Sequence, residues 1–369
     1  MKVLFLTKYP VEGASSRYRV YQYLPYLKNS NIDHVVSSFM SKKLYKLSFS
    51  SGNLFTKSYL TLFAILKRLC ILVSWKKYDV IYLQRELFPL GPPLIEKLLK
   101  KMGATLVYDY DDALFINKTN QYNKLVGFFR KPNKTIEIFK TVDCVLAGND
   151  YLRDTAASYC KNAITFEVAE DTKRIKKRAT RQDASKLIIG WLGSKTTVKY
   201  LNYIAVPLAK IQEKYPKVKF QVMGGDPGFS IPNVSIEHLT WSLENELIAL
   251  NDFDIGIMPL PNEEWSQGKS GGKARTYMAA GVVPVVTGIG YNLQLIDNGE
   301  TGFFCNDDQQ WFDTISRLIE NIDLREDVAN KARDYVMEHF DVEKQALKMA
   351  GILKDLLPKT TTLDNKRVN

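Results

Sequence analysis

Residues 268–286, GKSGGKARTYMAAGVVPVV, include the residue types that can hold a diphosphate. Gly271 and Gly272 carry no Cβ, so backbone N–H groups there can approach a ligand closely. They precede a predicted helix, and a helix N-terminus favours an anion. Lys269 and Lys273 lie four residues apart and could contact two oxygens of one diphosphate; the other interpretation is a Gly-Ser loop with solvated lysines. The patterns GxxxxGK[ST] and GxGxxG are both absent, which disfavours ATP hydrolysis.

A second loop with similar chemistry is GWLGSKTTVKYL, residues 190–201. Gly193 permits a tight turn, hydroxyl side chains can cap the following helix, and lysines lie near its positive end. Alone this pattern is common between a strand and a helix, but the two loops together predict a nucleotide-diphosphate pocket. The residues of these loops predicted to bind that nucleotide diphosphate are Gly193, Ser194, Lys195, Thr197, Lys199, Lys269, Ser270, Gly271, Gly272 and Lys273.

Three carboxylates, Asp109, Asp111 and Asp112, end the predicted strand TLVYDY in the first half of the chain. Carboxylates so close together repel each other, so some should pair with Arg or Lys. One of them could act as a base toward an acceptor hydroxyl or orient it. We therefore predict a catalytic role for these aspartates, and the alternative is a structural Asp–Arg network.

Basic side chains also follow two first-half strands. Arg17 and Arg19 come after the turn VEGASS, and at the start of a helix facing a cleft they could hold a phosphate of donor or acceptor. The alternative is that they are solvated. Arg85 and Glu86 end the strand VIYLQ and could either pair with each other or contact a ligand. The predicted acceptor- or phosphate-binding residues are Gly13, Arg17, Arg19 and Arg85.

The elements that must position these residues alternate between short apolar runs and amphipathic stretches, which is typical of parallel sheets. Helices are predicted at 18–27 and 198–213, among others. The fold class predicted is α/β, with two Rossmann-like domains facing each other across a cleft at the carboxyl ends of their strands. Strands are predicted at 3–6, 79–83, 105–108, 143–147, 187–189, 219–223, 254–258 and 282–286.

The predicted domains are residues 1–172 on the acceptor side and residues 187–340 on the donor side. Residues 173–186 contain seven basic residues and almost nothing to bury, so they are interpreted as the linker. Residues 341–369 are predicted to form a C-terminal helix, which could pack back on the first domain, followed by a polar tail.

Composition limits the class of protein. The chain has 369 residues, 45% of them hydrophobic and 25% charged, which is typical of a folded protein of about two domains. Lys and Arg exceed Asp and Glu by 51 − 40 = 11, which favours a negatively charged partner. Four scattered cysteines and three distant histidines predict neither a disulfide framework nor a metal site. The N-terminal MKVLFLTKYP is interpreted as a strand rather than a signal peptide, and no membrane-spanning run is found.

Residues 41–77 contain eight Lys or Arg, no Asp or Glu, and several aromatic residues. The apolar residues Tyr59, Leu62, Phe63, Leu66 and Leu69 recur there at helical spacing. One interpretation is a helix that lies in a membrane interface and is attracted to anionic lipid. The other is that the apolar stripe packs on the sheet and the lysines are solvated.

Several motifs, in this order, resemble the family-four (group 1) glycosyltransferases of the GT-B fold. The resemblance implies a retaining hexosyltransferase that takes a sugar from a UDP- or GDP-sugar held mainly by the second domain. The acceptor, a glycan or a lipid-linked glycan, would be held mainly by the first domain. The resemblance further implies synthesis of cell-surface polysaccharide or glycolipid, in the cytoplasm or peripheral on the inner face of the membrane. The motifs are ASSRYRVYQYLPYL, YLQRELFP, YDYDDALF, AGNDYL, IGWLGS, DFDIGIMPLP, GKSGGKARTYMAAGVVPVVT and NGETGFF.

The residue chemistry agrees with this resemblance, since Lys269, Lys273 and a helix N-terminus can stabilise a departing diphosphate. We therefore predict a catalytic role for Lys273, and neither a cofactor nor a metal. The chain departs from the family at the Glu-x7-Glu pair, whose positions hold Gly268 and Thr276. Thr276 can still hydrogen-bond a ribose hydroxyl, but more weakly than a carboxylate. A first-domain histidine that many members carry is also missing near DYDDA.

Two other functions are compatible with parts of the sequence. The missing glutamate pair would fit a non-catalytic nucleotide-sugar-binding subunit. The basic excess would fit a nucleic-acid-binding protein, but no RNP1 pattern, KH loop or zinc finger is present, so no nucleic acid is expected as a partner.

Overall fold

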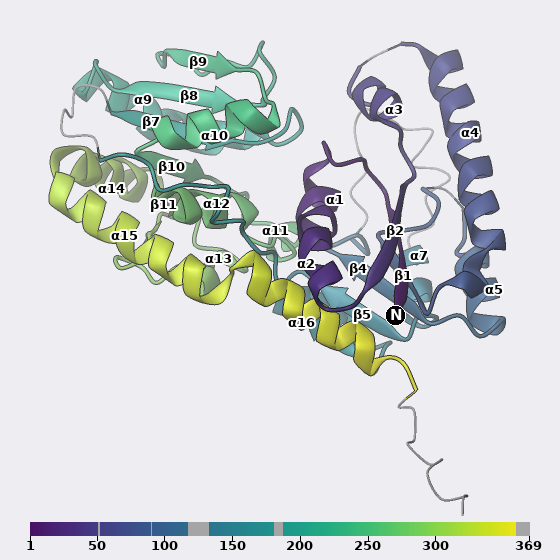
Figure 1. The fold of residues 1–369 in the computed structure, drawn as a ribbon. Coiled ribbons are helices and arrows are strands. Elements are labelled where there is room, and N and C mark those ends of the chain that lie inside the picture. The colour runs from purple at the N-terminus through teal and green to yellow at the C-terminus, as the bar shows by residue number, and fades with distance from the viewer. Residues whose placement is uncertain (51, 90, 117–132, 181–186, 359–369) are drawn as a thin grey trace, which may run out of the picture.

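The structure, a computed structural model, describes residues 1–50, 52–89, 91–116, 133–180 and 187–358. Within these residues the chain forms two domains, each built on a six-stranded parallel sheet covered by helices (Figure 1). The predicted polar tail, 359–369, and residues 181–186 of the predicted linker lie outside the described residues.

The first sheet has the strand order β2-β1-β3-β4-β5-β6. Every residue of its central strands β3, β4 and β5 is buried, as expected for a sheet with helices on both faces. The strands are β1 (Lys2–Thr7), β2 (Asp33–Ser38), β3 (Val80–Gln84), β4 (Leu106–Tyr110), β5 (Cys144–Ala147) and β6 (Ala163–Thr165). The helices are α1 (Ala14–Arg19), η1 (Tyr21–Tyr23), α2 (Leu24–Asn29), α3 (Lys42–Leu47), α4 (Leu54–Val73), η2 (Trp75–Lys77), α5 (Leu94–Lys101), α7 (Lys134–Phe139) and α8 (Asp150–Ala157).

The second sheet has the strand order β12-β11-β10-β7-β8-β9. Its strands are β7 (Ile188–Leu192), β8 (Lys219–Met223), β9 (Ile236–Leu239), β10 (Ile255–Met258), β11 (Val283–Val286) and β12 (Phe303–Phe304). The helices are η4 (Val198–Ile204), α9 (Ala205–Lys214), α10 (Leu243–Asp252), α11 (Glu264–Gln267), α12 (Gly272–Ala280), α13 (Asn292–Leu295), α14 (Asp308–Glu320), α15 (Ile322–His339) and α16 (Val342–Asp355).

All eight predicted strands are present, and the α/β prediction is confirmed. The four strands that were not predicted, β2, β6, β9 and β12, are the edge strands of the two sheets. Their residues are mostly half-buried rather than buried, and β6 and β12 have only three and two residues. Edge strands therefore lack the continuous apolar run by which the central strands were recognised.

The predictions of single helices at 18–27 and 198–213 are wrong in detail, because each segment is divided into shorter helices. The first consists of α1, η1 and α2, and the second of η4 and α9. Pro25 and Pro207 lie in the first turns of α2 and α9, where the missing N–H of proline has no helical partner to lose.

The loop predicted from residue 190 also begins later, since Gly190 belongs to β7. A Cβ at Gly190 would lie 2.1 Å from the ring of Phe253, so glycine is needed for that ring to pack on the strand.

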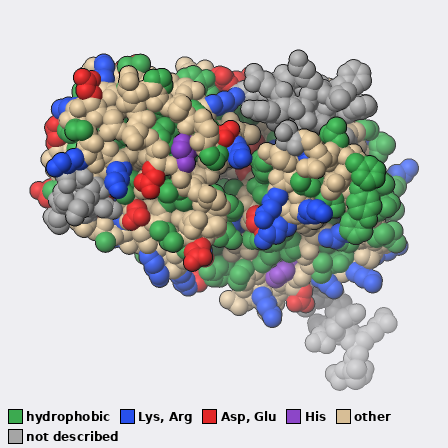
Figure 2. All heavy atoms as spheres, turned by 90° about the horizontal axis from the view of Figure 1, so that it is seen from above, with side chains coloured by type: hydrophobic (Ala, Val, Ile, Leu, Met, Phe, Trp, Pro, Cys, Tyr) green, Lys and Arg blue, Asp and Glu red, His purple; other side chains and the backbone are tan. Residues whose placement is uncertain are grey.

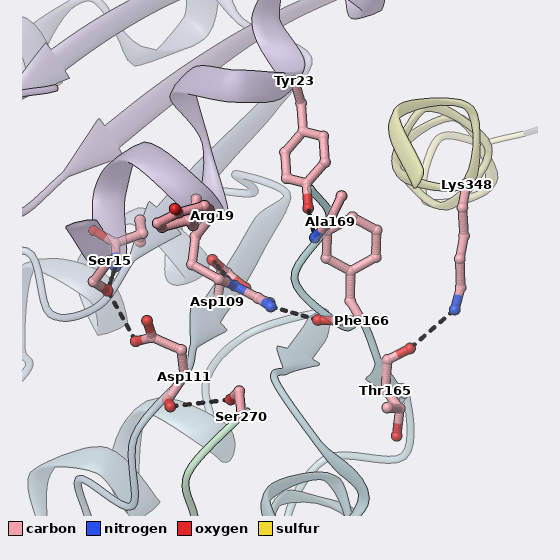
Figure 3. A network of polar contacts seen from close by, with 12 residues as sticks. Ser15, Arg19, Tyr23, Asp109, Asp111, Thr165, Phe166, Ala169, Ser270 and Lys348 are labelled. Carbon is pink, nitrogen blue, oxygen red and sulfur yellow. Dashed lines mark hydrogen bonds and ion pairs between the residues drawn. The ribbon is translucent and has the colours of Figure 1, made fainter. Parts of the chain in front are cut away.

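The C-terminal helix α16 crosses from the second domain to the first (Figure 1, yellow). Its apolar side chains join the first-domain core beside Val3 and Phe5, and Lys348 Nζ donates to Thr165 O at 3.2 Å (Figure 3). Where the chain crosses, Glu170 N–H donates to Phe340 O at 2.9 Å. The two crossing segments thus run side by side and form the joint between the domains.

Within the first domain, a buried ion pair fixes α1 to the sheet. Arg19 Nε lies 2.9 and 3.0 Å from the two carboxylate oxygens of Asp109 on β4, and its guanidinium also donates to Phe166 O (Figure 3). Both side chains are fully buried. α1 therefore has a fixed position at the edge of the cleft.

In the part of the chain that the structure describes, no helix is long and apolar enough to cross a membrane.

Replacing Asp109 by Asn should destabilise the first domain strongly, because it leaves the Arg19 guanidinium buried without a counter-charge. We expect the free energy of unfolding to fall by about 3–5 kcal/mol. Lys97→Ala, which removes the exposed ion pair with Glu137, is the matched control and should change the free energy of unfolding far less. Denaturant unfolding curves measure both; equal midpoints for the two variants would contradict the structural role of this pair.

Candidate active site

A cavity of about 680 Å³ lies between the two domains. Its walls come from segments that follow β1, β2, β4 and β6 in the first domain and β7, β8, β9 and β10 in the second, together with the start of α12. This is the carboxyl-end edge of both sheets, where open α/β sheets bind ligands, and the volume suits a small organic molecule.

The N-terminus of α12 forms one wall of the cavity. Gly271 takes the N-cap position with φ 62°, a left-handed conformation that glycine adopts without strain. No described side chain caps this helix end, so its first amide groups are left for a ligand. The arrangement gives an anion both hydrogen-bond donors and the positive end of the helix dipole.

Two ammonium groups flank this helix end. Lys269 Nζ lies 2.8 Å from Asp112 Oδ1 and 3.5 Å from the centre of the Trp265 ring. Burial, together with the positive charge of Lys269, lowers the pKa of Lys273 to about 8. An anionic ligand beside Lys273 would reverse that effect, because an opposite charge favours the protonated amine.

The loop after β7 forms the neighbouring wall. Gly193 N–H donates to Met223 O at 3.0 Å, and Ser194 N–H donates to Thr197 Oγ1 at 3.2 Å. The amides of Gly193 and Ser194 are therefore used within the protein, and the loop presents the side chains of Ser194, Lys195 and Thr197 to the cavity. Lys199 is exposed and does not line the cavity; its ammonium lies over the ring of Tyr200.

Both glycine-containing loops thus line the same cavity, as the sequence predicted. Of the residues predicted to bind the donor, all but Lys199 are on its wall: Gly193, Ser194, Lys195, Thr197, Lys269, Ser270, Gly271, Gly272, Lys273 and Thr276.

The three predicted aspartates have three different environments. Asp109 does not reach the cavity, because it lies within β4 and is paired with Arg19 in the core. Asp111 lines the cavity and accepts a hydrogen bond from Ser15 Oγ at 2.9 Å (Figure 3). Asp112 also lines it; burial opposes ionisation of Asp112, but Lys269 and Arg85 outweigh burial and hold its pKa below the usual value.

The predicted basic residues of the first domain are also separated. Arg17 lines the cavity, with its guanidinium 5.1 Å from the Trp241 ring and 3.4 Å from Glu246 Oε2. Arg19 does not, since Asp109 and Phe166 O occupy its guanidinium. Arg85 is buried behind the wall, 3.9 Å from Asp112 Oδ2, so Asp112 rather than Glu86 is its ion-pair partner.

Glu86 instead pairs with Lys8 at 3.9 Å. Gly13 is the N-cap of α1 rather than a lining residue. A Cβ at Gly13 would lie 2.3 Å from Tyr9 Cβ, so this glycine allows the chain to turn tightly into α1.

Sequence reasoning missed a polar cluster at the far end of the cavity, where Tyr18, Glu170 and Trp241 meet Arg17 and Glu246. Trp241 Nε1 donates to Glu246 Oε2 at 2.6 Å.

Glu170 is the most unusual member of this cluster. It is fully buried and accepts a hydrogen bond from Thr276 Oγ1 at 2.9 Å, and its Oε2 has no hydrogen-bond partner among the described residues. Burial raises the pKa of Glu170 to about 8, with Arg275 opposing and Glu246 adding to the shift. Glu170 lies next to none of the motifs found in the sequence. It reaches the cavity only because it lies at the joint between the domains.

Direct contact between the domains closes the floor of the cavity. Asn149 Nδ2 donates to Gln267 O at 3.0 Å and to Lys269 O at 2.9 Å. A Cβ at Gly268 would lie 2.6 Å from Ala113 Cβ and 3.0 Å from Ala113 N. This contact gives a physical reason for glycine at position 268, because a larger side chain would push the domains apart.

Among the described residues, no group of three or more His, Cys, Asp or Glu is arranged to hold a metal ion.

A family model described as "Glycosyl transferases group 1" matches residues 186–321. Curated protein sequences contain no match to the chain. Solved structures share its fold over nearly the whole length. HepE from Anabaena, in complex with UDP-glucose, has a TM-score of 0.70 at 15% identity and covers 96% of this chain and 100% of its own.

A glycosyltransferase from Rickettsia africae has a TM-score of 0.69 at 16% identity, with 97% of this chain and 99% of its own covered. Sucrose-phosphate synthase from Thermosynechococcus elongatus has a TM-score of 0.69 at 13% identity, with 96% and 99% covered. The predicted GT-B fold is confirmed, and residues 186–321, within the second domain, match the group 1 glycosyltransferase family model.

Gly268→Ala should separate the domains at the floor of the cavity, because its Cβ would meet the backbone of Ala113. We expect a loss of about 1–3 kcal/mol in stability and a larger radius of gyration by small-angle X-ray scattering. Gly351→Ala on α16, where a Cβ would meet nothing within 4 Å, is the matched control and should change neither. An unchanged radius of gyration and melting temperature for Gly268→Ala would show that the two loops do not touch in solution.

Proposed function

We propose that the chain transfers a hexosyl group from a UDP- or GDP-sugar to a glycan or lipid-linked acceptor, with retention of the anomeric configuration. One observation carries this proposal: the α12 N-terminus, Lys269, Lys273 and the Gly193 loop face one cavity between two Rossmann-like domains. The UDP-glucose complex of HepE, a protein of the same fold, supports a nucleotide-sugar as donor. Retention follows from the family resemblance, and cell-surface polysaccharide or glycolipid is the product class we propose with it.

In this proposal, the donor diphosphate lies against the first amides of α12, between Lys269 and Lys273. The bond between the anomeric carbon and the diphosphate oxygen breaks, and the negative charge that develops on the leaving oxygen is stabilised by these groups. Two fixed cations and a helix dipole at the same point can carry this charge without a metal, so we propose that none is required.

The acceptor hydroxyl approaches from the first-domain wall, where Asp111 and Asp112 lie. Its oxygen forms the new bond to the anomeric carbon, and its proton passes either to Asp111 or to an oxygen of the leaving diphosphate. Asp112 is the weaker candidate for the base, because Lys269 and Arg85 hold it in its ionised, ion-paired form.

The ribose of the donor would lie about one helical turn beyond the diphosphate, near Thr276. There Glu170 Oε2 is buried, has no hydrogen-bond partner in the part of the chain that the structure describes, and belongs to a residue that lines the same cavity. A hydroxyl of the ribose can satisfy that oxygen, and Glu170 would then supply part of the contact that Thr276 alone makes weakly.

The donor can be identified by thermal shift with UDP-, GDP- and ADP-sugars. A ligand present at about 100 times its Kd should add about 2.7 kcal/mol to the stability of the chain. Lys273→Ala should weaken donor binding about tenfold or more and abolish most transfer, because it removes a half-buried charge beside the diphosphate. Lys210→Ala, an exposed lysine outside the cavity, is the control for net charge.

The rate of sugar transfer in the presence of EDTA should equal the rate without EDTA.

The same experiment separates the alternatives. Donor binding with neither transfer nor donor hydrolysis would favour a non-catalytic subunit, and no shift with any nucleotide-sugar would contradict the proposal itself. Transfer lost in EDTA and restored by a divalent cation would contradict the metal-independent step. The anomeric configuration of the product, read by NMR, tests retention.

Donor affinity should fall as the pH rises above about 8. Lys273 in the free protein has a pKa of about 8, and the bound diphosphate raises it, so binding above pH 8 must take up a proton. Lys273 therefore carries its positive charge below pH 8, and the affinity for the donor is expected to fall by up to about tenfold per pH unit above pH 8.

Calorimetric titration of the intact sugar donor from pH 7 to 10 measures this dependence. Lys273→Arg, which stays charged, should give a flat profile over that range. The same decline in Lys273→Arg as in the unmodified chain would assign the titration to another group.

A further inference from the structure

Helix α4 carries an exposed apolar ridge on its outer face. Its side chains recur every three or four residues over the whole helix, and the largest are highly exposed, with Phe55 at 88% and Phe63 at 60%. The ridge consists of Leu54, Phe55, Tyr59, Leu62, Phe63, Leu66, Leu69 and Val73. The alternative that this stripe packs on the sheet is therefore wrong; the opposite face of α4 contacts the domain.

That inner face is narrow and partly polar. Only Ala64, Arg68 and Leu72 are buried on it. The guanidinium of Arg68 donates to Thr7 O at 2.9 Å and to Ser37 O at 3.3 Å, which ties the helix to the carboxyl ends of β1 and β2. These contacts hold α4 at the outside of the first domain (Figure 1), and the exposed side chains of the ridge lie on its outer face.

A contiguous exposed apolar surface of this kind marks a contact with a partner or a membrane. Figure 2 shows hydrophobic side chains gathered on the side of the molecule where α4 lies, with Lys and Arg side chains nearby. Within residues 41–77 the charges are of one sign, with eight Lys or Arg and no Asp or Glu. Of these, Arg68 is buried and Lys42 pairs with Glu12. Lys57 and Lys67 lie on α4 itself.

We propose that the ridge of α4 inserts into the surface of an anionic lipid bilayer, with the surrounding lysines on the lipid headgroups. A helix with one apolar face and basic residues beside it binds in this way through buried apolar area and attraction to anionic lipid. A second copy of the chain fits less well, because pairing two ridges would place Lys57 and Lys67 against like charges with no carboxylate on α4 to balance them.

A second part of the proposal concerns the acceptor and rests on the proposed function: the acceptor is lipid-linked. α3 leads directly into α4, and its residues Lys42, Tyr45 and Lys46, with Phe49 just beyond, also line the interdomain cavity. Phe49 is 47% exposed, and its ring lies 5.1 Å from that of Tyr45. An acceptor anchored in the bilayer under α4 would therefore reach the cavity along this aromatic edge.

The test is co-sedimentation of the full chain with vesicles of phosphatidylcholine alone and with vesicles rich in phosphatidylglycerol. We expect binding to the anionic vesicles that weakens with salt, and little binding to phosphatidylcholine. The double variant Leu62→Gln, Leu66→Gln should reduce vesicle binding about tenfold or more, since two leucines leave the bilayer. Leu347→Gln, an equally exposed leucine on α16, is the matched control and should bind as the unmodified chain does.

Each outcome decides something different. Equal vesicle binding by the double variant and the Leu347 control would overturn the proposal. A dimer in light scattering that the double variant dissociates would overturn it in favour of a second copy on the ridge. Failure of nucleotide-sugar binding leaves the vesicle result intact and contradicts only the proposed function. If the unmodified chain binds vesicles but transfers sugar only to soluble acceptors and never to a vesicle-embedded one, the lipid-linked acceptor alone is overturned.

Discussion

The close contact between the two domains at the floor of the cleft is the constraint on which the site depends. Neither domain contains a complete pocket, since the groups that we propose bind the diphosphate lie at the start of α12, and the carboxylates lie in the loop after β4. Asn149 binds two carbonyl groups of the segment before α12, and Gly268 packs on Ala113. Because these contacts are made by backbone atoms and small residues, they set the distance between Lys269 and Asp112 more firmly than long side chains could.

The three aspartates after the third predicted strand show how far sequence reasoning reaches. It predicted that carboxylates so close together would be paired with Arg or Lys, and Asp109 with Arg19, and Asp112 with Lys269 and Arg85, are such pairs. It could not tell which aspartate would be buried, because the strand continues through Asp109, and a charged residue inside a strand is recognised only when its partner is known. Arg19 lies 90 residues away in the sequence.

The strands and helices were predictable where a short segment of sequence carries the pattern. The site was predictable where glycine and lysine lie together beside a strand. The edge strands and the cluster at the far end of the cavity were not predictable for the same reason: nothing in their own sequence distinguishes them. Glu170 follows an ordinary apolar stretch, and it becomes a site residue only because the crossing chain at Phe340 holds it against Thr276. A residue of this kind requires the tertiary structure.

The joint and the ridge of α4 together constrain how the protein can work. α16 returns to the first domain and packs in its core, so the two domains are connected by two crossing segments rather than by one linker. Two adjacent crossings permit a hinge but resist separation, and movement of the second domain would then open and close the cavity over a first domain that stays in place. If the first domain is held on a bilayer through α4, as we propose, a lipid-linked acceptor would stay at a fixed depth, and the moving domain would be the one proposed to carry the donor. Donor exchange with the surrounding water then requires no release from the membrane.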